Sequence, residues 1–95
     1  MHVGVIHTIK DRARWDEVTG SIDLDAMPPG VTLLATVTAT DVSRAICMWD
    51  GPSVEEIQAM LDGLLGPAAV NDCFAADAAR SLGVAQPAQS EGAQA

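Results

Sequence analysis

The stretch RAICMWD at residues 44–50 constrains the fold more than any other part of this chain. In a β-strand, successive side chains point to opposite faces. Alternation therefore divides the stretch into two sets, Ala45, Cys47 and Trp49 on one face and Arg44, Ile46 and Met48 on the other. Both faces are apolar in the middle. Because apolar surface is buried where it can be, we expect this strand to lie in a sheet that is covered on both sides.

Two further segments read as strands. Residues 2–9 and 31–40 are rich in β-branched and other apolar residues with alternating positions. A turn-like sequence at 41–43 separates the second of these from the strand that begins at residue 44. We therefore expect the segments 31–40 and 44–50 to form an antiparallel hairpin.

Two helices are expected between the strands. Asp11 is a suitable N-cap for a short helix that carries Trp15 and Val18 on one side. Ser53 begins a second helix, with Glu56 three residues later as in a capping box. The apolar residues of this second helix recur at helical spacing and predict its buried stripe, namely Val54, Ile57, Met60, Leu61 and Leu64.

Residues 69–84 admit two interpretations. Their alanine content favours a helix, whereas Val70, Cys73, Phe74 and Ala76 are compatible with a short final strand. With that strand, the order becomes β-α-β-β-α-β, the split motif of ferredoxin-like domains. We predict an α+β fold with a four-stranded antiparallel sheet and two helices on one face. The domain spans residues 1–84, and residues 85–95 read as a disordered tail.

The open face of such a sheet would remain apolar, and a second copy of the chain is its simplest cover. We therefore expect a homodimer. The 95 residues carry a net charge of −8, which argues against nucleic acid and anionic membranes as partners. No apolar run is long enough to span a bilayer, and two cysteines without a CxxC pattern predict reduced thiols in the cytoplasm.

Several segments resemble small bacterial proteins of the dimeric α/β-barrel superfamily, namely VIHTIKDRARW, MPPGVTL, RAICMWDGPSVEEIQAML and VNDCFAADAARSLGV. The resemblance covers about residues 2–86 and is closest to an uncharacterised branch near small nickel-binding ferredoxin-like proteins. It implies a barrel-like dimer that encloses a small cavity, and it favours a strand at Cys73–Ala76. Relatives often carry histidine early in the second strand, where this chain has Leu34 and Ala35.

The candidate site residues admit more than one role. Cys47 is first a small core residue, with metal ligation or nucleophilic chemistry as alternatives. His7, Cys47 and Cys73 would bind nickel or zinc if alternation placed all three on one face. His7 is otherwise a hydrogen-bonded core histidine, or a general base facing a cavity. The tryptophans pack the core or line a pocket for an aromatic ligand, with Trp49, Met48 and Leu34 as the candidate ligand contacts.

These observations leave three functional hypotheses. The first is a small binding protein that holds an apolar or aromatic ligand, or a transition metal, in a cavity lined by His7, Cys47, Trp49 and parts of the second strand. The second is a cofactor-independent monooxygenase- or isomerase-like enzyme with His7 as its general base. The third is a structural dimer whose cavity is filled by its own side chains.

Overall fold

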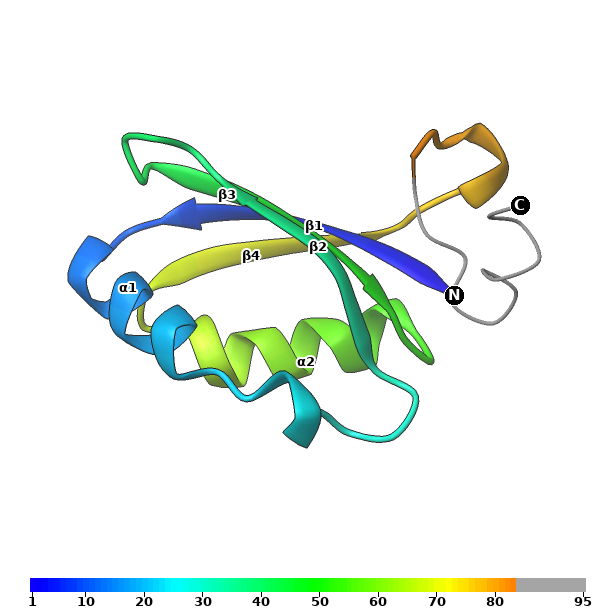
Figure 1. Ribbon diagram of the computed structural model, residues 1–95, viewed down its shortest axis with the longest axis horizontal. Helices are drawn as coiled ribbons and strands as arrows, with labels where there is room; N and C mark the ends of the chain where they lie inside the picture. The colour runs from blue at the N-terminus through cyan, green and yellow to red at the C-terminus, as the bar shows by residue number, and fades with distance from the viewer. Residues whose placement is uncertain (84–95) are drawn as a thin grey trace.

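A four-stranded antiparallel sheet forms one layer and two α-helices form the other (Figure 1). The computed structural model describes residues 1–83, so the predicted tail at 85–95 lies outside the described residues. The elements follow the expected order: β1 (His2–Ile9), α1 (Arg12–Ser21), η1 (Leu24–Ala26), β2 (Thr32–Thr38), β3 (Arg44–Asp50), α2 (Val54–Leu65), β4 (Ala69–Ala75) and η2 (Ala78–Arg80). The strand order β2-β3-β1-β4 confirms the ferredoxin-like α+β fold.

The ambiguous segment after α2 is a strand. β4 pairs with β1 along its whole length, from Ala69 opposite Ile9 to Ala75 opposite Val3. Its alternating burial places Ala69 and Asn71 against the core. The ladder with β1 thus overrides the helix propensity of the alanines, because it pairs one edge of β4 with β1 and buries one face of the strand at the same time.

Strand register decides which side chains face the helices. Val3, Val5 and His7 of β1 point to the helix side, together with three residues of β3, Ala45, Cys47 and Trp49. The opposite face is apolar, as expected, and no described helix covers it (Figure 1). Its large apolar side chains are between 44% and 65% exposed, namely Ile6, Val37, Ile46, Val70 and Phe74.

Helix α2 supplies most of the cover on the helix side. The Ser53 hydroxyl accepts a hydrogen bond from the Glu56 backbone N–H at 3.1 Å, so the predicted cap is confirmed. The buried stripe of the helix runs through Ile57, Leu61 and Leu65. The predicted core role of Leu64 is wrong, because this side chain is 37% exposed. The buried stripe follows i, i+4 spacing through Leu65, so the adjacent Leu64 lies toward the outer side of the helix.

Helix α1 is short and largely polar, and Trp15 is its one buried residue. The connection from α1 to β2 therefore supplies the remaining cover over the inner side of β2. This cover is incomplete, since no residue of β2 is fully buried. Among residues 1–83, no helix is long and apolar enough to cross a membrane.

Candidate functional site

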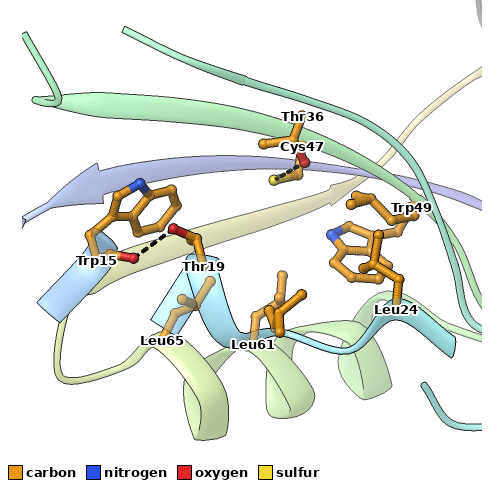
Figure 2. A pocket seen from close by; sticks show the side chains of 10 residues that line it. Trp15, Thr19, Leu24, Thr36, Cys47, Trp49, Leu61 and Leu65 are labelled. Atoms are coloured by element: carbon orange, nitrogen blue, oxygen red, sulfur yellow. Dashed lines mark hydrogen bonds between the residues drawn. The ribbon is translucent and has the colours of Figure 1, made fainter. Parts of the chain in front are cut away.

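A pocket of about 220 Å³ lies between the sheet and the helices, where the cover over β2 and β3 is incomplete (Figure 2). Two strands, both helices and the connection after α1 contribute its walls, through Trp15, Thr19, Ile22, Leu24, Leu33, Thr36, Cys47, Trp49, Leu61 and Leu65. None of these side chains is charged. The pocket lies within one chain, whereas the sequence predicted a cavity of a homodimeric barrel.

Trp49 brings the pocket an unused hydrogen-bond donor. Its side chain is only 2% exposed, and its Nε1 atom is buried without a partner. It is the only buried side-chain nitrogen or oxygen in this condition among residues 1–83. Figure 2 shows the indole nitrogen on the edge of the ring that is turned toward the pocket. A buried N–H without an acceptor costs free energy, so a ligand acceptor that reaches this atom would be favoured.

Cys47, His7 and Asn71 form a hydrogen-bonded row across three adjacent strands. The Nε2 atom of His7 lies 3.1 Å from the Sγ atom of Cys47, and the Nδ1 atom lies 2.7 Å from the Oδ1 atom of Asn71. His7 is fully buried, and the Trp15 ring covers it with a distance of 5.2 Å between the ring centroids. The row is therefore shielded from bulk water on the helix side.

The orientation of the Asn71 amide fixes the tautomer of His7. The Nδ2 atom of Asn71 donates to Oδ1 of Asp62 at 3.1 Å, so its Oδ1 atom faces His7 as an acceptor. Gln58 holds this arrangement by donating to both Asp62 carboxylate oxygens and to the Asn71 carbonyl. His7 must then carry its proton on Nδ1, which leaves Nε2 as an acceptor toward the Cys47 thiol.

Burial keeps both members of the Cys47–His7 pair neutral. Burial lowers the pKa of His7, and the hydrogen bond with Asn71 opposes this only in part. Burial raises the pKa of the Cys47 thiol, and the hydrogen bond with Thr36 works in the opposite direction. The pKa of Cys73 is raised to about 11, first by burial and then by the negative charges of Asp62 and Asp72.

The structure brings together His7 and Cys47, two of the three predicted metal ligands, but not Cys73. Cys47 and Cys73 both pair with Val5, from opposite sides of β1, and both are free thiols. Neither His7 nitrogen bonds to Cys73, because one is directed to Cys47 and the other to Asn71. Within residues 1–83, no group of three or more His, Cys, Asp or Glu side chains is arranged to hold a metal ion.

The predicted ligand contacts divide between two faces. Trp49 lines the pocket, whereas Met48 pairs with Gly4 on the open face and Leu34 lies at an irregularity in the β2–β3 ladder. His7 does not line the pocket, but its Nε2 atom contacts the sulfur of Cys47, which does line it. His7 therefore reaches a ligand only through the thiol.

Sequence reasoning missed Asn71 and Thr36 as members of the site. Thr36 lies opposite Cys47 on β2, with its Oγ1 atom 3.3 Å from the sulfur (Figure 2). One signal was available: Asn71 alternates with Ala69, Cys73 and Ala75, so a strand that turned this set inward would give the amide a buried position that requires a partner. Comparison of the chain with models of known protein families, with curated proteins and with solved structures gives no match. The resemblance to the dimeric α/β-barrel superfamily therefore stays a prediction.

Proposed function

We propose that this protein binds a small, flat, uncharged molecule that is mostly apolar and carries one hydrogen-bond acceptor. The observation that carries the proposal is the unpartnered Nε1 atom of Trp49 at an otherwise apolar pocket. An acceptor oxygen, such as that of a ketone, would satisfy the indole N–H. The tryptophan rings and leucines would contribute contact with an apolar or aromatic body.

The dimensions of the pocket limit the ligand. Sites for drug-sized molecules measure roughly 300–1,000 Å³, and this pocket of about 220 Å³ is smaller. A molecule of one or two rings is the appropriate size. The absence of charged side chains from the lining disfavours carboxylates, phosphates and amines, since an unpaired charge in an apolar site is costly.

Calorimetric titration with 1-indanone and with indane tests this proposal. The two compounds share a fused-ring skeleton, but only the ketone carries an acceptor. We expect the ketone to bind about 3- to 10-fold more tightly, which corresponds to one net hydrogen bond. In a Trp49→Phe variant the ketone should lose this advantage. Failure of both compounds to bind the wild-type protein would contradict the proposal.

We also infer that a second copy of the chain covers the open sheet face. The exposed apolar side chains on β1, β2, β3 and β4 would be buried together by such a partner. Charge supports this occupant: Arg44 and Asp72 both lie on this face and balance each other, so two copies can meet there despite the net charge of −8.

Sedimentation velocity tests this assembly. The wild-type protein should sediment as a dimer, and Ile46→Glu should produce a monomer, because it would place like charges in an apolar interface. Leu82→Glu is the matched control, since Leu82 is 97% exposed and lies outside the sheet. A monomeric wild-type protein, or a dimeric Ile46→Glu variant, would refute the proposed interface.

The two free thiols further support a reducing compartment, the cytoplasm, as the location.

A further inference from the structure

We infer that Cys47 is a nucleophile, that His7 accepts its proton, and that the matching substrate class is a small α,β-unsaturated ketone held in the pocket. The inference rests on the proposed function, because the pocket must admit a small apolar ketone. It goes further by assigning a reaction to the thiol.

The side chains are arranged as nucleophile, base and orienting group. His7 on β1 lies directly opposite Asn71 on β4, and Cys47 on β3 lies diagonally across from His7. The distances of 3.1 Å from His7 Nε2 to Cys47 Sγ and 2.7 Å from His7 Nδ1 to Asn71 Oδ1 are both within hydrogen-bonding range. A thiol next to a bare imidazole nitrogen, with the imidazole oriented by a third group, is the arrangement that nucleophilic catalysis requires.

The orienting group, Asn71, is held in place by hydrogen bonds to two side chains of α2. Asn71 is held by the Asp62 carboxylate and by Gln58, which also accepts a hydrogen bond from the backbone N–H of Cys73 at 3.2 Å. The amide cannot turn without bringing its own N–H groups against the His7 N–H. Asp62 is the carboxylate that accepts a hydrogen bond from the orienting amide. Asn71 and Asp62 are positioning residues, because neither lines the pocket.

The Cys47 sulfur has two hydrogen-bonding neighbours, and Cys47 also lines the pocket. His7 lies on one side of Cys47, and the Thr36 hydroxyl lies on another at 3.3 Å. Because the thiol proton is directed to His7, the Thr36 hydroxyl is free to donate to the sulfur, which would stabilise a developing thiolate. Cys47 lines the pocket together with Trp49, whose side chain lies two residues along on the same face of β3 (Figure 2).

This arrangement matches conjugate addition. The sulfur forms a bond to the β-carbon of the enone, and the electron pair of the C=C bond moves toward the carbonyl oxygen as the enolate forms. The thiol proton passes to Nε2 of His7 and is then delivered to the α-carbon. The product is a saturated ketone joined to Cys47 by a thioether bond, and no other reactant is consumed. The Trp49 N–H is the donor available for the negative charge that develops on the oxygen.

Alkylation by 2-cyclohexen-1-one, followed by intact mass spectrometry, tests the inference. Cys73 is the matched control thiol, because it is partly exposed on β4 and neither nitrogen of His7 bonds to it. The Cys73→Ala variant reports Cys47 alone, and the Cys47→Ala variant reports Cys73 alone. We expect Cys47 to react at least about 10-fold faster at neutral pH, since general-base catalysis contributes roughly 10²- to 10⁴-fold.

The pH profile of the Cys47 reaction gives a readout that leaves His7 in place. Cys73, with a pKa of about 11, should react about 10-fold faster for each pH unit between about pH 7 and 9, as its thiolate fraction rises. Cys47 should show a nearly flat rate over this range, because neutral His7 removes the proton during the reaction. A Cys47 rate that rises about 10-fold per pH unit would overturn the inference.

Two further variants are made in the Cys73→Ala background. His7→Gln should slow Cys47 alkylation at least about 10-fold, and Thr36→Val, on the exposed edge strand, should slow it about 3-fold. Unchanged rates in folded protein would overturn the inference. This test is separable from that of the proposed function. If 1-indanone binds but alkylation does not depend on His7, only the role of Cys47 as a nucleophile is refuted. If alkylation depends on His7 but 1-indanone does not bind, only the reversible binding role is refuted.

Discussion

His7 and Cys47 are in direct contact inside the core, with 3.1 Å between Nε2 and Sγ. The other ring nitrogen of His7 is bonded to Asn71, so each nitrogen of this fully buried ring has one partner. Protonation of the ring would place a second N–H against the thiol and a charge in a site of low dielectric. The contact is therefore suited to a neutral imidazole.

The stability of the protein should consequently fall below neutral pH. In the unfolded chain His7 titrates near its ordinary pKa of 6.5, and burial lowers that pKa in the folded chain. Below about pH 6.5 the unfolded chain therefore binds a proton that the folded chain does not, so the stability that is fully present above this pH is lost as the pH falls toward the folded pKa. Urea unfolding at about pH 7.5 and pH 5.5 should show a loss of up to about 1.4 kcal/mol per pH unit.

The control for this loss is His7→Gln, which is uncharged throughout and leaves His2 in place. The variant should have lower stability at neutral pH but a shallower dependence between the two pH values. Equal pH dependence in both proteins would show that other groups are responsible and that the folded-state pKa of His7 is not lowered.

The tautomer of His7 is a second testable property. Because Oδ1 of Asn71 can only accept, the proton of the neutral ring should reside on Nδ1. Long-range ¹H–¹⁵N NMR of the imidazole rings should then show an unprotonated Nε2 for His7, and the spectrum of His7→Gln identifies the signals of His2. A proton on Nε2 would make Cys47 the acceptor and would remove the base from the proposed reaction.

The sequence was sufficient to predict the fold because its local signals agree with one another. The Ser53 cap, the alternation in β3 and the hairpin after β2 each specify one element without reference to the rest. The last strand was the exception, since its alanines favour a helix and only the ladder with β1 decides the outcome. Asn71 therefore could not be placed, because its direction depends on that ladder.

The candidate site was less predictable because it depends on register and on coverage. A slip of one residue between β1 and β3 would turn His7 and Cys47 to opposite faces, and alternation alone does not exclude it. Met48 and Leu34 were expected near a ligand, yet the pocket lies on the other face of β3, where α1 and the following connection leave a gap. Such a gap reflects the packing of a whole layer, which no local pattern encodes.

Neighbouring leucines in α2 provide a third prediction about the core. Both Leu64 and Leu65 fit an apolar helical stripe in sequence, but only Leu65 is buried. We expect Leu65→Ala to lower the free energy of unfolding by about 2–5 kcal/mol and Leu64→Ala by less than about 1 kcal/mol. Urea denaturation of the two variants measures both values. The opposite ranking would mean that the helix is rotated relative to the arrangement described here.

The contact between Gly4 and Phe74 on the open face gives the last prediction. These residues are direct cross-strand partners, and a Cβ atom added at Gly4 would overlap the Cζ atom of Phe74. The phenyl ring thus covers the glycine, and Gly4→Ala should cost about 1–3 kcal/mol because the ring must move away. In a Phe74→Ala background the same substitution should cost nothing or stabilise the strand by up to about 1 kcal/mol, because alanine loses less conformational entropy than glycine. A double-mutant cycle measured by urea unfolding gives the coupling between the two positions. A coupling near zero would mean that the phenyl ring does not rest on Gly4 in solution.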